Sequence, residues 1–291
     1  MNGSEIDPTR ATSVDLNRRA FVGIAAAAAT GVGTAASALG QPATPPLGRP
    51  HPPLVAEDDP GIVVERVEAA GPDAVTAYAA WPVHARANAP SVVVIMHLWG
   101  VDASIRDVVR RFAKAGFAAI APDLYARFGA PSGDNGSDVA TFRPYAKRLD
   151  RARYDGDARA AAMWLATKFP STKTGIVGFC MGGRIAMLAA IDNDGVFCAV
   201  CPFYGPLNDV KPEELRIPIC GSYGARDSGI PAESVRAFTE ELLVPNDIRI
   251  YDDAGHAFFD DQRSAFVPAA AADAWKRTVA FLGKYAGQPN P

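Results

Sequence analysis

Between residues 62 and 286, short apolar runs alternate with stretches whose apolar residues recur at helical spacing. Runs such as Ser91–Met96 (SVVVIM) are apolar at nearly every position, which is typical of a strand covered on both faces. Repeated strand–helix units of this length favour a mostly parallel sheet flanked by helices on both faces, an α/β fold. Ligands of such sheets bind beyond the carboxyl ends of the strands, so we expect functional residues directly after strands.

The pattern predicts the bounds of each element. We expect strands at Ile62–Val67, Val75–Trp81, Ser91–Met96, Phe117–Ala121, Thr174–Phe179, Phe197–Tyr204, Ile217–Tyr223 and Ile248–Tyr251. We expect helices at Asp102–Ala115, Asp157–Phe169, Met181–Ile191, Pro231–Leu243 and Pro268–Tyr285. Gly71-Pro72 between the first two strands indicates a hairpin.

The N-terminal residues have a different composition. Arg18-Arg19 precede an uncharged run of mostly Ala, Gly, Thr and Val, and Ala36-Ser37-Ala38 has the small-x-small form of a signal-peptidase site. This pattern predicts a twin-arginine signal peptide over residues 1–38 and an exported protein, periplasmic or secreted. The alternatives are a membrane anchor or a soluble Ala-rich helix. Because the run is barely apolar enough to be retained in lipid, we expect no stable membrane insertion after cleavage.

A Pro-rich stretch follows, with seven prolines between Pro42 and Pro60. Fixed φ angles and missing N–H donors argue against a helix or central strand there, so we expect a linker over 39–60. The remaining residues, 61–291, are predicted to form a single domain.

Charge and cysteine content exclude several classes of protein. With 29 Lys+Arg against 32 Asp+Glu, the chain has no electrostatic basis for binding nucleic acid. Four cysteines in 291 residues do not make a disulfide scaffold. No metal-ligand spacing, phosphate loop or dinucleotide fingerprint follows a suitable strand, so we expect neither metal nor cofactor. We expect a monomer that acts on a small molecule.

One motif sits directly between a predicted strand and a predicted helix. Residues 178–183 read GFCMGG, the nucleophile-elbow form G-x-nucleophile-x-G with Cys180 at its centre. A sharp turn strains the central residue, and glycine two residues away on either side avoids a clash. The turn also sets Cys180 at a helix N-terminus, which favours thiolate. A buried structural cysteine is the alternative, but the flanking glycines favour a nucleophile.

Two further candidates follow later strands. Asp227 lies in GARD after the strand ending near Tyr223, and His256 lies in AGHAF after the strand through Tyr251. Taken singly, the aspartate could be a turn residue or helix cap, and a lone histidine indicates little. The order Cys180, Asp227, His256 matches the nucleophile–acid–histidine order of α/β-hydrolases.

Several of these segments together resemble the dienelactone hydrolase (carboxymethylenebutenolidase) family. They are Val94–Tyr125 with its APDLYAR segment, GFCMGG, Phe203-Tyr204-Gly205, GARD and AGHAF, in order over roughly residues 62–286. The resemblance implies an α/β-hydrolase fold and a Cys–His–Asp triad that hydrolyses a cyclic enol-lactone or related ester. Cys180 would attack the carbonyl, His256 would take its proton and Asp227 would orient the imidazole.

An oxyanion formed in that reaction needs two backbone donors. The elbow supplies the N–H of Met181, and the resemblance implies Leu98 as the second donor. The family carries a glutamate that partners the resting thiol at the position of His97. We hypothesise that His97 is a second partner of the thiol; the alternative is a residue of the pocket wall.

The substrate-binding residues depart from the family in a second way. The family binds a substrate carboxylate with two arginines, of which Arg127 matches the first and Asp260 replaces the second. Asp260 would repel a carboxylate, and Arg263 is a possible substitute nearby. Trp99, Tyr125, Tyr204 and Phe258 are expected to line the pocket, although core packing is the usual role of such aromatic residues.

The other cysteines carry a weaker signal. Cys198 and Cys201 fall within one strand and point to opposite faces, which argues against a redox pair. Cys201 and Cys220 hold equivalent places before two Tyr-Gly strand ends, so we expect these two cysteines to be neighbours and favour free thiols over a disulfide.

Two other functions compete with a lactone or ester hydrolase: an exported ligand-binding protein on the same scaffold, and a thioesterase-like acyl hydrolase.

Overall fold

The structure is a computed structural model that describes residues 48–69, 75–131, 133, 138–170, 173–192 and 195–287. All of these residues belong to the unit Thr44–Pro291. The predicted signal peptide over 1–38 and the first part of the predicted linker lie outside the described residues. Both remain predictions.

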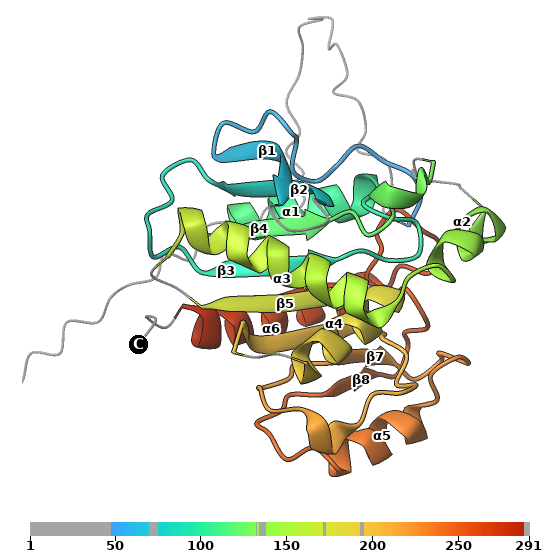
Figure 1. The fold of residues 1–291 in the computed structure, drawn as a ribbon. Helices are drawn as coiled ribbons and strands as arrows, with labels where there is room; N and C mark the ends of the chain where they lie inside the picture. The colour runs from blue at the N-terminus through green and yellow to red at the C-terminus, as the bar shows by residue number, and fades with distance from the viewer. Residues whose placement is uncertain are drawn as a thin grey trace, which may run out of the picture. The chain divides into compact units, whose positions relative to one another are not determined.

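One eight-stranded sheet runs through the domain in the order β1-β2-β4-β3-β5-β6-β7-β8 (Figure 1). Its strands are β1 (Ile62–Ala69), β2 (Val75–Pro82), β3 (Ser91–Ile95), β4 (Ala118–Pro122), β5 (Thr174–Phe179), β6 (Phe197–Phe203), β7 (Ser222–Gly224) and β8 (Arg249–Tyr251). β1 and β2 pair antiparallel, as expected, while the predicted turn at Gly71-Pro72 lies outside the described residues; β2 is also antiparallel to β4. All other neighbours are parallel, which confirms a mostly parallel sheet.

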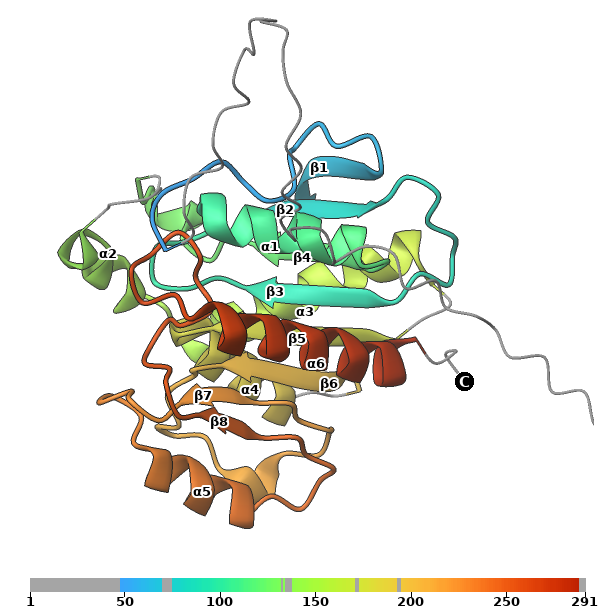
Figure 2. The same cartoon turned by 180° about the vertical axis from the view of Figure 1, so that it is seen from behind.

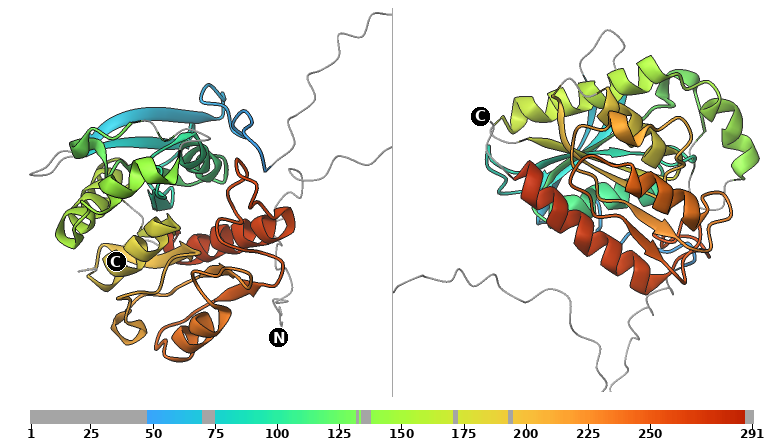
Figure 3. Two further views of the ribbon diagram at one scale, coloured as in Figure 1. Left: turned by 90° about the vertical axis from the view of Figure 1, so that its right-hand side faces the viewer. Right: turned by 90° about the horizontal axis from the view of Figure 1, so that it is seen from below.

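Helices cover both faces of this sheet. They are α1 (Ala103–Lys114), α2 (Val139–Ala146), α3 (Arg151–Lys168), α4 (Met181–Ile191), α5 (Ala232–Glu240) and α6 (Pro268–Ala286), with 3₁₀ turns η1 (Ala126–Phe128) and η2 (Pro212–Glu214). α3 and α4 lie in front of the sheet in Figure 1, and α1 and α6 lie in front of it in Figure 2. Figure 3 shows these layers from the side and from below. The arrangement is that of the α/β-hydrolase fold.

The two central strands explain why the candidate site lies where it does. β3 and β5 are buried along their whole length, and they pair in parallel register from Ser91↔Thr174 to Ile95↔Gly178. An apolar side chain on both faces of a strand is stable only when helices cover both faces. Because the two strands run in parallel, the turns that follow them meet at one edge of the sheet.

The bounds of some helices and strands differ from those predicted from the sequence. α3 begins at Arg151, six residues before the predicted start, because the Asp150 side chain caps it by accepting from the Arg153 N–H at 3.1 Å. The short helix α2, which contains Pro144, was not predicted. β7 is confined to Ser222–Gly224, shorter than the predicted strand.

Residues 48–60, the described part of the predicted linker, contain no helix or strand but lie against the domain. The Val55 N–H donates to Asp107 Oδ1 at 2.8 Å, and Arg110 Nε donates to the Val55 carbonyl at 2.5 Å. The His51 N–H donates to Gln262 Oε1 at 2.9 Å. The contacts attach this stretch to α1 and to the loop before α6.

Candidate active site

Cys180 occupies a strained turn between β5 and α4. Its φ of 55° and ψ of −121° lie outside the regions that L-residues favour, and its N–H donates to the Phe203 carbonyl at 3.0 Å. A Cβ atom on Gly178 would lie 2.0 Å from the Gly182 carbonyl oxygen. A Cβ on Gly182 would lie 2.3 Å from the Met96 carbonyl oxygen. The predicted reason for the glycines of the elbow is therefore confirmed by the close approach of main-chain atoms.

The structure brings Cys180, Asp227 and His256 into one chain of contacts. His256 Nε2 lies 3.0 Å from Cys180 Sγ, and His256 Nδ1 lies 2.6 Å from Asp227 Oδ2. The other carboxylate oxygen of Asp227 accepts from the Gly229 N–H at 2.9 Å and the Ile230 N–H at 3.2 Å. Asp227 is buried, and these two bonds fix its carboxylate toward the imidazole.

The electrostatics of His256 favour its protonated form. Burial opposes the positive charge, but the hydrogen bonds to Asp227 and Cys180 outweigh burial and raise the pKa of His256 to about 10. The imidazolium is therefore a proton donor held 3.0 Å from the sulfur atom of Cys180. The arrangement can therefore supply a nucleophilic sulfur and a nearby proton.

The two candidate oxyanion donors lie against the same tyrosine. Tyr125 Oη donates to the Leu98 carbonyl at 3.0 Å and lies 3.9 Å from Met181 Sδ. Within the described part of the chain, neither the Leu98 nor the Met181 N–H donates to a backbone carbonyl in the turns and loops. Burial, followed by the nearby charge of Cys180, raises the pKa of Tyr125, so its hydroxyl keeps its proton and remains a donor.

The other aromatic residues predicted for the pocket differ in burial. Tyr204, with a φ of 38°, lies with its ring 5.2 Å from the ring of His256. Phe258 is fully buried and packs on Tyr204 and Tyr251. Trp99 is half-buried and lines a cavity of about 210 Å³ beside Tyr125. Their roles in binding substrate stay predictions.

Arg127 has a partner that the sequence did not indicate. Its guanidinium donates to both carboxylate oxygens of Asp157 on α3, at 2.8 and 2.6 Å. A bidentate pair of this kind holds the guanidinium in one orientation. Asp157 is thirty residues away in the chain, and no local pattern connects it with Arg127.

His97 contacts carboxylates in place of the thiol. Its Nε2 lies 3.0 Å from Asp102 Oδ1 and its Nδ1 lies 3.8 Å from Asp260 Oδ2, within a buried region. The hypothesis that His97 is a second partner of Cys180 is therefore wrong, because both ring nitrogens face other groups. The sequence did not indicate Asp102 as the partner of His97, although it did predict that Asp102 lies at the start of α1.

The remaining cysteines are free thiols. Burial raises the pKa of Cys198 to about 11 and raises the pKa of Cys201 well above its usual range. Cys220 Sγ lies 3.7 Å from Arg277 Nη2. Cys198 and Cys201 lie in β6, and the Cys220 N–H donates to the Val200 carbonyl of the same strand at 2.9 Å.

Across the described ranges, no group of three or more His, Cys, Asp or Glu side chains is arranged to hold a metal ion. Nor does any helix in that part of the chain combine the length and apolar character needed to cross a membrane.

Comparison with known proteins identifies the family. The family model for the dienelactone hydrolase family matches residues 75–286. The chain is 34% identical over 234 residues to a protein of Escherichia coli (strain K12) named "Putative carboxymethylenebutenolidase", covering 75% of this chain and 85% of that protein. A protein of Methylorubrum extorquens with the same name is 34% identical over 230 residues, covering 72% of this chain and 77% of that protein.

A solved structure gives the same result. The crystal structure described as a "Putative Dienelactone Hydrolase" from Klebsiella pneumoniae superposes with a TM-score of 0.70 at 30% identity. The match covers 77% of this chain and 99% of that chain. With its α/β-hydrolase sheet, its cysteine elbow and these relatives, the chain belongs to the dienelactone hydrolase family.

Proposed function

We propose that the protein hydrolyses a carboxylic ester or lactone with Cys180 as nucleophile. The observation that carries the proposal is the series of contacts Cys180 Sγ–His256 Nε2 at 3.0 Å and His256 Nδ1–Asp227 Oδ2 at 2.6 Å. A nucleophile within reach of a base that is itself oriented by a third group is the signature of covalent catalysis. Membership of a hydrolase family supports the same reaction class.

In the first half of the reaction, the Cys180 thiolate attacks the ester carbonyl carbon. A C–S bond forms and the carbonyl oxygen becomes an oxyanion, which accepts hydrogen bonds from the N–H groups of Leu98 and Met181. The tetrahedral intermediate then collapses, the C–O bond breaks, and the imidazolium of His256 gives its proton to the leaving alkoxide. The product is a thioester on Cys180 and an alcohol.

In the second half, the neutral His256 takes a proton from water while the water oxygen attacks the thioester carbon. The second tetrahedral intermediate expels the Cys180 thiolate and releases the acid. His256 again carries a proton, with Asp227 accepting its Nδ1–H, so the resting ion pair is restored.

A substrate panel with matched cysteine variants tests this proposal. Wild-type protein, Cys180→Ala and Cys198→Ala are assayed on an aryl acetate, on dienelactone and on an acyl thioester. We expect Cys180→Ala to lower kcat/KM by about 10³-fold or more, because the covalent intermediate cannot form. Cys198→Ala should keep the wild-type rate, since Cys198 lies at the start of β6, next to the start of β5, whereas Cys180 follows the end of β5, and the pKa of Cys198 is raised to about 11.

Each other outcome of the panel has a definite meaning. Equal rates for Cys180→Ala and wild type would contradict the proposal and leave a binding protein on this scaffold. A preference for the thioester over both oxygen esters would identify a thioesterase-like acyl hydrolase. Activity on dienelactone would show whether Arg127, paired with Asp157, still accepts a substrate carboxylate.

We also propose that the protein is exported by a twin-arginine route. The support is the sequence alone: paired Arg18 and Arg19 before an uncharged run that ends at Ala38. Fractionation of cells expressing the full chain should find a shortened protein in the periplasm. Replacing both arginines by lysine should retain the full-length chain inside the cell, whereas Arg10→Lys should have no effect. Processing of the double variant at the wild-type level would exclude this route.

A further inference from the structure

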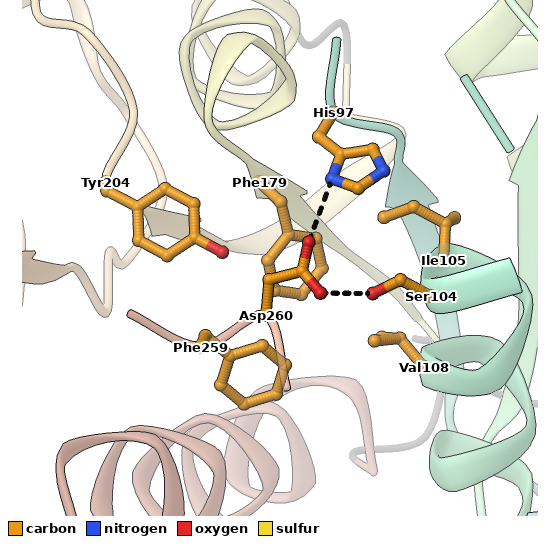
Figure 4. Close-up of a pocket in the computed structure, with 8 residues that line it drawn as sticks. All are labelled: His97, Ser104, Ile105, Val108, Phe179, Tyr204, Phe259 and Asp260. Carbon is orange, nitrogen blue, oxygen red and sulfur yellow. Dashed lines mark hydrogen bonds and ion pairs between the residues drawn. The ribbon is translucent and has the colours of Figure 1, made fainter. Parts of the chain in front are cut away.

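Three buried side chains (His97, Asp102 and Asp260) and the partly buried Arg263 form an ion cluster beside the proposed catalytic residues, called the buried ion cluster below. His97 Nε2 lies 3.0 Å from Asp102 Oδ1, and His97 Nδ1 lies 3.8 Å from Asp260 Oδ2 (Figure 4). Arg263 Nε donates to Asp260 Oδ2 at 3.0 Å, and Arg263 Nη2 lies 4.0 Å from Asp102 Oδ2. Each carboxylate therefore faces both basic groups.

The charges in this cluster balance when His97 is protonated. Burial opposes the charge on His97, but the carboxylates of Asp102 and Asp260 outweigh burial and the opposing charge of Arg263, and they raise its pKa. The cluster then contains two cations and two anions. Losing one member would leave an uncompensated buried charge, which is costly.

The cluster joins the two segments that supply the reacting groups. His97 and Asp102 lie at the two ends of the turn 97–102, which contains Leu98. Asp260 lies in the loop 252–267 that also contains His256, and its N–H donates to the Ala257 carbonyl at 3.0 Å. One set of ion pairs thus connects the proposed oxyanion donor with the loop of the proposed base.

Neighbouring contacts hold both sides of this connection in place. Ser104 Oγ on α1 donates to Asp260 Oδ1 at 3.1 Å, as Figure 4 shows, and the Gln262 N–H donates to the same oxygen at 3.1 Å. The Arg263 guanidinium stacks 3.5 Å from the ring centre of Trp99. Trp99 directly follows Leu98, so the stacking restrains the turn at its centre.

We infer that the buried ion cluster positions the Leu98 N–H and the His256 imidazole relative to each other, with His97 and Asp260 as positioning residues for the reaction. This inference rests on the proposed function. Buried ion pairs contribute little net stability compared with well-packed apolar residues, so stability alone does not account for four of them. Catalysis, by contrast, depends on reacting groups held within a fraction of an ångström.

The test compares Asp260→Asn with its sequence neighbour Asp261→Asn. Both carboxylates are buried, but Asp261 pairs with Arg111 and His51, neither of which belongs to the turn 97–102. We expect Asp260→Asn to lower kcat by about 10- to 100-fold with little change in KM, the size of effect that a 1 Å misplacement produces. Asp261→Asn should keep kcat per active site even where it lowers the melting temperature. The concentration of active sites is measured as the amount of Cys180 that reacts with iodoacetamide.

Two further changes separate positioning from a loss of folding. His97→Gln should lower kcat to a similar extent, and the double variant with Asp260→Asn should fall no further than the lower single variant, because both act through one contact. Where the larger changes unfold the protein, Ser104→Ala takes their place, because it removes only one hydrogen bond to Asp260. We expect it to lower kcat by roughly 3- to 10-fold.

A second readout keeps this inference separate from the proposed function. The rate at which iodoacetamide alkylates Cys180 as a function of pH reports the His256–Cys180 ion pair without any ester. A changed profile in Asp260→Asn but not in Asp261→Asn supports positioning, even if no ester of the panel is cleaved. Identical kcat and identical alkylation profiles for Asp260→Asn and Asp261→Asn would overturn the inference.

Discussion

Replacing Asp227 by asparagine is expected to lower kcat/KM on an aryl ester by about 10⁴-fold, as the same change does in a serine triad. The carboxylate lies 2.6 Å from His256 Nδ1 and accepts a hydrogen bond from its N–H. An amide of the same shape can turn its NH₂ group toward that nitrogen, which selects the wrong tautomer. The protein should still fold, because the Gly229 and Ile230 N–H groups keep an oxygen acceptor.

The same variant should change the pH dependence of the reaction in a defined direction. The hydrogen bond to Asp227 is among the causes that raise the pKa of His256 to about 10, so its loss lowers that pKa. Acylation needs the imidazolium as proton donor. On the basic side of its pH profile, kcat/KM of the wild type should therefore fall as pH rises through about 10. In Asp227→Asn this basic limb should move to lower pH.

Profiles of kcat/KM for three proteins check both statements. The matched control is Asp253→Asn, which removes an exposed carboxylate three residues before His256 that pairs with Arg226. It should keep the wild-type rate and the wild-type basic limb. An Asp227→Asn profile with an unmoved basic limb would show that Asp227 does not set the protonation of His256.

Replacing Gly182 by alanine is expected to destabilise the protein by about 3 kcal/mol or to prevent folding, because the added methyl group overpacks the core. Its Cβ would lie 2.3 Å from the Met96 carbonyl oxygen and 2.6 Å from the Ile95 carbonyl oxygen. Both atoms belong to the main chain at the end of the central strand β3, which cannot move aside without shifting the sheet. Urea unfolding, followed by circular dichroism, measures the effect.

Gly156→Ala is the control for this change. Gly156 lies in α3, is exposed, and has no atom within 4 Å of an added Cβ. Alanine there should stabilise the protein by about 0.5–1 kcal/mol, because glycine loses more backbone entropy in a helix. If Gly182→Ala unfolds at the same urea concentration as wild type, the close approach of α4 to β3 is not what requires glycine.

Much of the site followed from local patterns. The bounds of β5 and α4 agree with prediction because a continuous apolar strand ends at a glycine-rich turn, and both signals lie within a few residues. The positions of Asp227 and His256 after strand ends could be predicted as well, because each residue directly follows a predicted strand of a parallel sheet. α2 and the first turns of α3 were missed because their helices carry many polar residues and, in α2, a proline.

The class of fold, the strained cysteine turn and the order of the three proposed catalytic residues could be predicted from the amino-acid sequence, because each depends on neighbours along the chain. The partners of the charged side chains could not be predicted, because they come together only when the chain folds. Arg127 pairs with a residue of α3, and His97 faces a carboxylate in the loop before α6, far along the chain. A charge carries no preference for a distant partner until folding removes it from water, and the groups then nearest to it become its partners.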